Sequence, residues 1–472
     1  MPTLLKSHRI TTWDPEDTVA WEAGNKYIAR RNLIWSVIAE HVGFSIWSIW
    51  SVMVLFMPEA VYGFSAGDKF LLGATATLVG SCLRIPYTLA TAAFGGRSWT
   101  VFSAFVLVIP TAGTLWLLAH PGLPLWPFLL CAALAGFGGG NFASSMTNIN
   151  AFYPQRLKGW ALGLNAGGGN IGVPMIQLVG LLVIATAGNR APYWVCAVYL
   201  VALAVAGVGA ALYMDNLTPH KVDTGAMKAI LAQRDTWVIS LLYVGTFGSF
   251  IGFAFAFSQV LQINFVAAGH GPAEAALQAA QIAFLGPLLG SLSRVYGGKL
   301  ADRIGGERVT LAVFAGMILA AGLLVTVSMV DDRTGVGGVT TAGQVIGFIL
   351  LFALSGLGNG SVYTMIPAVF EARSHGLPVD EAQRQQWSLS MSGALIGFAG
   401  AVGGLGGVGI NLALRESYRT DSTTPSFTTA FWIFLAFYLL AAIVTWVRYV
   451  RRPSATELTA ARPDRHGCAM VG

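Results

Sequence analysis

The 472-residue chain has few charged residues, few cysteines and no spacing of His and Cys that would suit a metal ion. Only 11% of its residues are charged while 55% are hydrophobic, and the mean hydropathy is +0.63. This composition excludes a soluble or disordered protein and indicates a polytopic membrane protein. The four cysteines, Cys82, Cys131, Cys196 and Cys468, do not form a disulfide framework. With no metal cluster, nucleophile–base pair or cofactor motif, we expect neither an enzyme nor a bound cofactor.

Long apolar stretches dominate the rest of the chain. About twelve of them are long enough to cross ~30 Å of hydrocarbon, which predicts an all-α fold of two pseudo-symmetric six-helix bundles in a lipid bilayer. The predicted division is a tail at 1–31, a bundle at 32–213, a linker at 214–236, a second bundle at 237–450 and a tail at 451–472.

Basic residues predict the orientation. Most of the 28 Lys and Arg residues fall in the two tails and in alternate connections, which the positive-inside rule places in the cytoplasm together with both termini. The net charge of +6 reflects this bias and no nucleic-acid surface. In the first tail, Asp14 begins a predicted helix whose Trp13, Trp21 and Tyr27 would lie on the inner membrane surface as a topological anchor.

Two arginines interrupt the apolar stretches in matching contexts 210 residues apart. Arg84 ends the run Gly-Ser-Cys-Leu-Arg and Arg294 ends Gly-Ser-Leu-Ser-Arg. Each precedes a Gly-Gly turn, at Gly95 and Gly305, by 11 residues, or roughly 16 Å along a helix. Both therefore lie near the middle of the membrane, where an arginine costs at least about 2.5–3.5 kcal/mol. This repeat predicts duplicated halves with an anion-binding site between them.

Acidic residues that could neutralise this pair are scarce. Of the 22 Asp and Glu residues, only Glu40 falls well inside a predicted span. Nine residues after Arg31, it is expected nearer the cytoplasmic edge, in a structural role. Two guanidinium forks suit a small flat oxyanion, which they can bind bidentately.

Aromatic and amide side chains are the further candidates for this site. Phe44, Phe142 and Tyr243 could cover the faces of a flat anion. Asn165 and Asn170 lie about 140° apart on an ideal helix, so that only one of them should reach the pathway. We expect this to be Asn170.

Two glycine-rich segments carry a family resemblance. Residues 136–170, with Asn-Phe-Ala-Ser-Ser-Met at 141–146 and Asn-Ala-Gly-Gly-Gly-Asn at 165–170, resemble the signature of the nitrate/nitrite porter (NarK-type) family of the major facilitator superfamily. Gly-Leu-Gly-Asn-Gly-Ser-Val-Tyr at 356–363 resembles its second signature, and residues 298–306 are similar to the superfamily's cytoplasmic loop motif. The resemblance implies a bacterial inner-membrane transporter of nitrate and nitrite, and we expect a monomer.

The same resemblance implies roles for individual residues. Arg84 and Arg294 would clamp the anion, Phe142 and Tyr243 would border it, Phe44 would flank it and Asn170 would donate a hydrogen bond. Asp302 and Arg303 of the loop motif would latch neighbouring helix ends as a gate. In the eleventh span, Gly400 stands where the family pattern leads us to expect a serine.

Energetics favour exchange over net uptake. An inside-negative potential opposes anion entry by about 2.3 kcal/mol per charge per 100 mV, whereas exchange of nitrate for nitrite moves no net charge. Proton-coupled nitrate symport is the alternative and would need a titratable group in the path, for which Glu40 is the candidate. An anion channel or a membrane sensor would share the arginines. However, a channel needs no duplicated bundles, and a sensor usually adds a soluble output domain.

Overall fold

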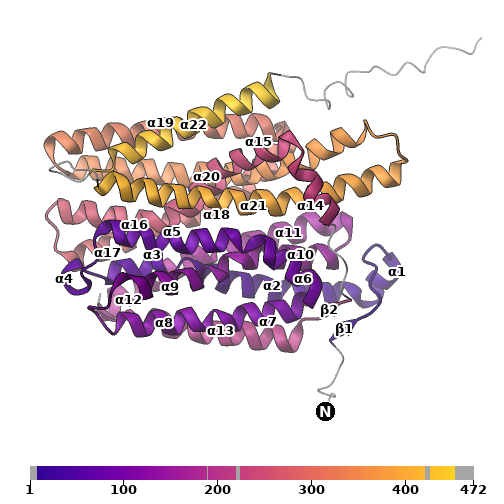
Figure 1. The fold of residues 1–472 in the computed structure, drawn as a ribbon, viewed down its shortest axis with the longest axis horizontal. Coiled ribbons are helices and arrows are strands. Elements are labelled where there is room, and N and C mark those ends of the chain that lie inside the picture. Colours follow the sequence, from indigo (N-terminus) through magenta and orange to yellow (C-terminus); the bar gives the residue numbers. More distant parts are fainter. Residues whose placement is uncertain (1–7, 189, 219–223, 420–425, 452–472) are drawn as a thin grey trace, which may run out of the picture.

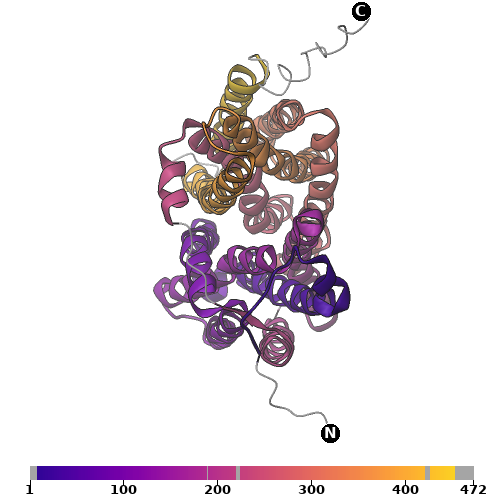
Figure 2. The ribbon, with the colours of Figure 1, turned by 90° about the vertical axis from the view of Figure 1, so that its right-hand side faces the viewer.

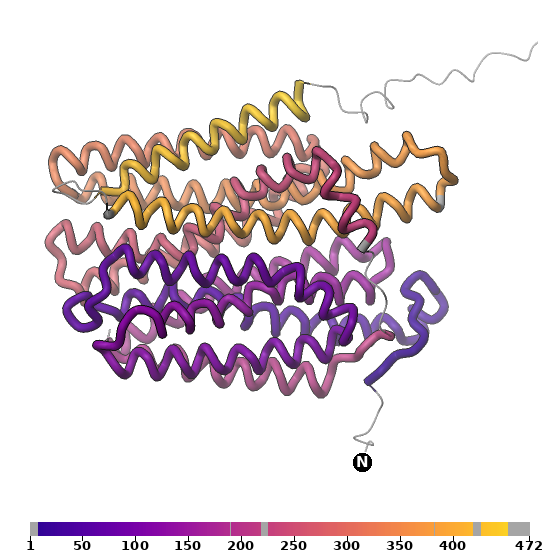
Figure 3. The backbone as a smooth tube through the Cα atoms, in the orientation of Figure 1, coloured from indigo at the N-terminus to yellow at the C-terminus, as the bar shows by residue number. Residues whose placement is uncertain are grey.

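The computed structural model describes residues 8–188, 190–218, 224–419 and 426–451. Within them, ten helices are long and apolar enough to cross a membrane, or up to twelve if each of two bent helix pairs is one span. The chain runs back and forth along the long axis of the molecule (Figures 1 and 3). The all-α prediction is confirmed. The predicted tail at 451–472 lies outside the described residues except for Arg451.

The helices form two groups that are separate in sequence and in space. Viewed along the helices, those before residue 214 lie on one side and those after residue 233 on the other (Figure 2). The first group, the N-terminal bundle, contains α2 (Lys26–Trp47), α3 (Trp50–Met53), η2 (Val54–Phe56), α5 (Ala66–Cys82), α6 (Arg84–Phe94), α7 (Gly96–Val106), α8 (Val108–Leu118), α9 (Leu125–Ala135), α10 (Phe137–Phe152), α11 (Gln155–Asn170), α12 (Gly172–Ala187) and α13 (Tyr193–Tyr213).

The second group, the C-terminal bundle, repeats this arrangement with longer unbroken helices. It contains α15 (Arg234–Tyr243), η3 (Val244–Gly248), α16 (Ser249–Ala267), α17 (Pro272–Ala283), α18 (Leu285–Ile304), α19 (Gly306–Thr334), α20 (Gly338–Ser374), α21 (Glu381–Arg419), α22 (Thr428–Thr445) and η4 (Trp446–Val450). The helix α4 (Glu59–Tyr62) and the turns after α16 and α19 lie at one end of the molecule (Figure 1). We call this the opposite end. The other end, where the described tail and the last helix terminate, is the terminal end.

Glycines allow the helices around the centre to approach closely. A Cβ atom added at Gly139 would lie 2.7 Å from the Trp47 ring, and one at Gly140 would lie 2.7 Å from the Tyr87 ring. In the C-terminal bundle, Gly360 packs in the same way against the backbone of Arg294. The glycine-rich segments therefore bring α10 and α20 against the helices that carry the two arginines, because any side chain there would push them apart.

The N-terminal tail folds back onto the N-terminal bundle. Residues Arg9–Ile10 (β1) pair in parallel with Asn216–Leu217 (β2), directly after α13. Trp21 is 3% exposed and packs edge-on against Tyr153 at 5.7 Å. The expectation that Trp13 and Trp21 lie on the membrane surface is therefore wrong, because both rings cover the ends of spans instead. The short helix α1 (Thr18–Ala20) is capped by Asp17 and not by Asp14.

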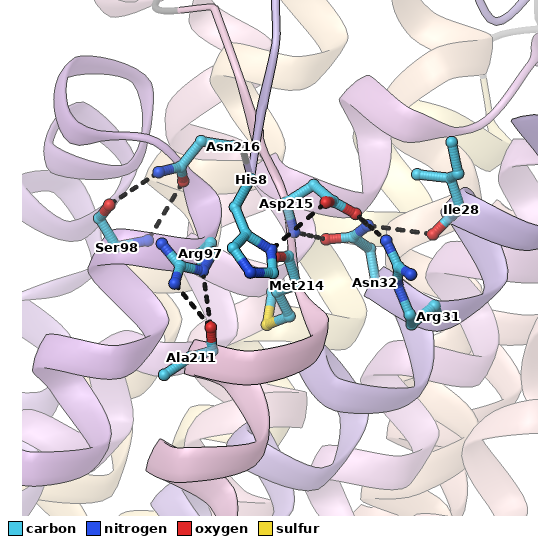
Figure 4. Close-up of polar contacts among 10 residues, drawn as sticks. All are labelled: His8, Ile28, Arg31, Asn32, Arg97, Ser98, Ala211, Met214, Asp215 and Asn216. Carbon is cyan, nitrogen blue, oxygen red and sulfur yellow. Dashed lines mark hydrogen bonds and ion pairs between the residues drawn. The ribbon is translucent and has the colours of Figure 1, made fainter. Parts of the chain in front are cut away.

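Ion pairs join the helix ends of each bundle at the terminal end. Arg31 at the start of the first span donates to Asp215 after α13 at 2.6 Å, and Asn32 donates to the same carboxylate at 3.1 Å (Figure 4). In the C-terminal bundle the charges are reversed: Asp235 of α15 accepts from Arg448 of η4 at 3.0 Å. Arg373 of α20 also donates to Asp235.

Candidate functional site

A break in the second span positions Arg84. The helices α5 and α6 meet at an angle of 41°, and Arg84 is the first residue of α6. Pro86 explains the break, because it has no N–H for the carbonyl of Cys82 and its ring crowds that carbonyl. Arg84 is only 1% exposed. It lies between the two bundles, because its Nη1 donates to the carbonyl oxygen of Gly400 in α21 at 2.9 Å.

The guanidinium of Arg84 keeps one polar edge available. Its Nε and Nη2 atoms are buried and have no hydrogen-bond partner among the described residues. These two nitrogens lie on the same edge of the planar group, the edge that binds a carboxylate or other oxyanion with two parallel hydrogen bonds. Leaving such donors buried costs about 1–3 kcal/mol or more. The geometry therefore suits a flat oxyanion at this edge.

Aromatic rings enclose the same guanidinium. Its central carbon lies 4.6 Å from the ring centroid of Phe247, 4.9 Å from that of Phe142 and 5.8 Å from that of Trp47. Cation–π attraction of about 0.5–2 kcal/mol per ring offsets part of the cost of removing the charge from water. No carboxylate is within salt-bridge distance of Arg84 among the described residues, so these rings stabilise the charge without consuming its hydrogen bonds.

Arg294 approaches the site from the C-terminal bundle. Its guanidinium carbon lies 5.8 Å from the centroid of Phe142, the ring that Arg84 also contacts, and 5.2 Å from that of Tyr363. It is less buried than Arg84, and its Nη1 has no hydrogen-bond partner among the described residues. The structure thus brings both predicted arginines to one aromatic side chain, with one arginine from each bundle.

The predicted aromatic residues take different places. Tyr243 is fully buried, stacks on Phe247 at 5.2 Å and contacts the Tyr363 ring at 4.8 Å. The hydroxyl groups of Tyr243 and Tyr363 have no hydrogen-bond partner among the described residues. Phe44 stacks on Phe142 at 6.2 Å and so lies behind that ring.

Three aromatic contacts of the arginines were not predicted. Phe247 follows Tyr243 by four residues and Trp47 follows Phe44 by three, spacings that place both pairs on one helical face. Tyr363 ends the second glycine-rich segment. The helical spacing could have identified Phe247 and Trp47 from the sequence, and the position at the end of a glycine-rich segment could have identified Tyr363.

Buried amides lie on the helices around the arginines. Asn170 is 1% exposed and its Oδ1 has no hydrogen-bond partner among the described residues. Asn359 of α20 is also 1% exposed, and its Oδ1 also has no hydrogen-bond partner among the described residues. The Oδ1 of Asn165 is likewise unpartnered among the described residues, but its Nδ2 donates to the Glu40 carboxylate at 2.6 Å and to Ser145 at 2.8 Å. Asn165 is thus bonded to Glu40 and Ser145, and the role of Asn170 toward an anion stays a prediction.

Glu40 lies deeper than the sequence indicated. It is 1% exposed, it accepts hydrogen bonds from Ser145 and Asn165, and its Oε1 has no partner among the described residues. It precedes Phe44 by four residues, so it lies one turn of α2 from the aromatic stack, on the side of the terminal end. Glu40 is more enclosed than an edge position would be, because nine residues of α2 carry it roughly 13 Å past Arg31, which lies at the terminal end. Its structural role stays a prediction.

The predicted gating residues lie at the surface. Asp302 and Arg303 are both exposed near the end of α18 and form no hydrogen bond or ion pair with another described residue. Their latch role stays a prediction. Among the residues that the structure describes, no group of His, Cys, Asp and Glu could hold a metal ion.

Comparisons with known proteins define the family. The Major Facilitator Superfamily model matches residues 41–409. The chain is 35% identical to the nitrate/nitrite transporter NarU of Salmonella typhimurium, over 94% of this chain and 96% of that protein. It is 31% identical to a probable nitrate/nitrite antiporter, NarK2, of Thermus thermophilus, over 95% and 99%.

A solved structure supports the fold alone. The crystal structure of a D-xylose-proton symporter matches with a TM-score of 0.63 and 15% sequence identity, covering 91% of this chain and 99% of that one. At that identity it carries no information on substrate. Together with the family model and the curated relatives, it leads to one conclusion: this chain belongs to the major facilitator superfamily, and within it to the family of the nitrate/nitrite transporters.

Proposed function

We propose that the protein exchanges nitrate for nitrite across the bacterial inner membrane, binding either anion between Arg84 and Arg294. One observation carries the proposal: the Nε–Nη2 edge of Arg84 is buried beside Phe142 with no hydrogen-bond partner in the part of the chain that the structure describes. The guanidinium of Arg294 contacts the same ring. The names of the relatives, nitrate/nitrite transporter and probable nitrate/nitrite antiporter, support this substrate class.

The chemistry of the site favours a small planar anion. A guanidinium edge offers two parallel N–H donors, which match two oxygens of nitrate or nitrite. Phe142 is positioned to cover a flat ion next to both arginines. A tetrahedral dianion would bring a second charge into this mostly aromatic enclosure and could not lie flat, so the hydrogen bonds would not offset its desolvation.

Alternation between the bundles follows from where the arginines lie. Each bundle contributes one arginine, and Arg84 also bonds across to Gly400. With no anion between them, two like charges oppose the approach of the bundles in a low-dielectric interior. An anion removes that opposition, so the loaded protein changes access more readily than the unloaded one, and this favours exchange.

The excess of Lys and Arg in the tails and alternate connections places the terminal end in the cytoplasm. Both termini are then cytoplasmic, as the sequence predicts. We propose that the protein acts as a monomer, because each chain carries both arginines.

Counterflow in proteoliposomes tests this function. Nitrate uptake should require nitrite or nitrate inside the vesicles and should not respond to an imposed pH gradient. Vesicles loaded with sulfate are the control and should take up little nitrate. Equal uptake into nitrite-loaded and sulfate-loaded vesicles would refute obligate exchange.

Proton-coupled nitrate symport is a second candidate, because a buried carboxylate lies one helical turn from the aromatic stack. An inward proton gradient would then drive nitrate uptake into vesicles without internal nitrite. Glu40→Gln, which keeps the size and the hydrogen-bonding oxygen, should abolish that uptake, whereas Glu59→Gln at the surface of α4 should not. If Glu40→Gln leaves counterflow unchanged and no gradient-driven uptake occurs, exchange is retained.

A further inference from the structure

Buried side-chain hydrogen bonds join the two bundles between the arginines and the opposite end. The side-chain amide of Gln177 in α12 donates to the carbonyl oxygen of Ala254 in α16 at 2.9 Å. Ser258 of α16 donates to the carbonyl oxygen of Ser51 in α3 at 2.6 Å. The amide of Gln259 donates to the carbonyl oxygen of Ala66, at the start of α5, at 2.7 Å.

Ser51, Gln177 and Ser258 form one connected group, and Gln259 follows Ser258 on α16 and bonds α5 separately. We call these four residues, Ser51, Gln177, Ser258 and Gln259, the polar seam. Gln177 links it, because its amide also donates to the Ser51 hydroxyl at 3.2 Å. All four side chains are buried, with at most 4% of their surface exposed. The helices α3, α12 and α16 lie toward the opposite end of the molecule (Figure 1).

The seam is polar where apolar packing would close the interface more firmly. Each hydrogen bond contributes only about 0.5–1.5 kcal/mol net, because water can replace it when the interface opens. The Oε1 atom of Gln177 is buried without a partner among the described residues. Such an atom costs free energy in the closed arrangement and would recover it on contact with water. The seam therefore holds the bundles together weakly enough to separate repeatedly.

The seam continues directly into the anion site. Trp47 is the last residue of α2 and lies four residues before Ser51, across the 41° break between α2 and α3. Its ring packs edge-on against Phe255 of the C-terminal bundle at 6.1 Å. The same Trp47 ring lies 5.8 Å from the guanidinium carbon of Arg84. A change at Arg84 and a separation of Ser51 from Ser258 thus act on neighbouring parts of the same interface, on either side of the break between α2 and α3.

We propose that the polar seam is the outer gate of the transporter and that Gln177 sets how often it opens. Release of the Gln177–Ala254 and Ser258–Ser51 bonds exposes the site to the outside, and their re-formation closes it. The inference depends on the proposed function only through alternation between the bundles and the orientation of the terminal end.

Cysteine labelling in whole cells tests the gate without any transported anion. The four native cysteines are replaced by alanine, and Ser81→Cys provides the reporter. Ser81 is 1% exposed, packs against Gly404 across the interface and lies three residues before Arg84. Labelling by a membrane-impermeant maleimide from outside should be slow. Gln177→Ala should raise the rate about 2- to 10-fold, the change expected for one net hydrogen bond.

Matched variants separate gating from general destabilisation. Gln344 is an equally buried glutamine whose bonds to Asn264 and Asp331 stay within the C-terminal bundle, so Gln344→Ala should not raise labelling. Ser258→Ala should raise it, whereas Ser249→Ala on the same helix should not, because Ser249 bonds Tyr438 of its own bundle.

Three outcomes would overturn the proposal. The first is an unchanged labelling rate in both Gln177→Ala and Ser258→Ala, with gel filtration showing intact protein. The second is an equal increase of the labelling rate in Gln344→Ala. The third is fast labelling of the reporter protein before any seam residue is changed. Because no nitrate is involved, failure of the gate is distinguishable from failure of the nitrate/nitrite assignment. The latter is judged by counterflow alone.

Discussion

Replacing Arg84 by lysine removes the fork and keeps the charge. The ammonium group of lysine is a single point of positive charge and cannot present the parallel Nε and Nη2 donors that lie unpartnered in the site. A hydrogen bond to a charged group contributes about 1.5–3 kcal/mol, so the loss of one of the pair should weaken nitrate binding about 10- to 150-fold. The lost contacts with Phe142 and Phe247 act in the same direction.

The assay is isothermal titration of purified protein with sodium nitrate, followed by counterflow in proteoliposomes. Arg97→Lys is the matched control, because Arg97 is an arginine of the same bundle that donates to the carbonyl oxygen of Ala211, away from the site. Arg84→Lys should elute as a folded species and lose counterflow, while Arg97→Lys should retain it. Nitrate affinity within threefold of the unmodified protein in Arg84→Lys would refute the fork argument.

Three further changes are predicted from the same structure. Phe142→Ala should weaken nitrate binding and allow sulfate to compete, because the ring shared by both arginines is lost; titration with each anion checks this. Gly400→Ala should impair binding more than Gly397→Ala on the same helix, since a Cβ at Gly400 would lie 3.0 Å from Nη1 of Arg84 whereas one at Gly397 meets open space. Equal effects of the two would contradict this. Asp235→Asn should lower the melting temperature with counterflow preserved, because Arg373 and Arg448 lose a buried carboxylate; a loss of about 1–3 kcal/mol is expected for these partly exposed arginines. An unchanged melting temperature would argue against that role.

The sequence predicted the parts of the site that follow from side-chain chemistry. Arg84 and Arg294 were identifiable because a charge in an apolar stretch is costly and because their contexts repeat at a constant interval. Phe142 and Tyr243 were found with the help of the family resemblance. Phe142 contacts both arginines, whereas Tyr243 contacts Phe247 and Tyr363, the rings beside them.

The missed features depend on the backbone and on depth. The contact of Arg84 with Gly400 uses a backbone carbonyl, which every residue type has, so no side-chain pattern could identify Gly400 as an acceptor. The exact placement of Arg84 depends on the 41° break before α6. The enclosure of Glu40 depends on Ser145 and Asn165, which donate to its carboxylate from other helices, and counting residues along the first span does not reveal such contacts.

The opposite signs of the two terminal-end ion pairs have a consequence for assembly. In the N-terminal bundle the first helix carries the cation, Arg31, and Asp215 follows the last; in the C-terminal bundle the first helix carries the anion, Asp235, and the last segment the cation, Arg448. If the first helix of one bundle met the last segment of the other, Arg31 would face Arg448, or Asp235 would face Asp215, and the two charges would repel. This opposition of like charges disfavours an exchange of first helices between the two bundles as they form in one membrane.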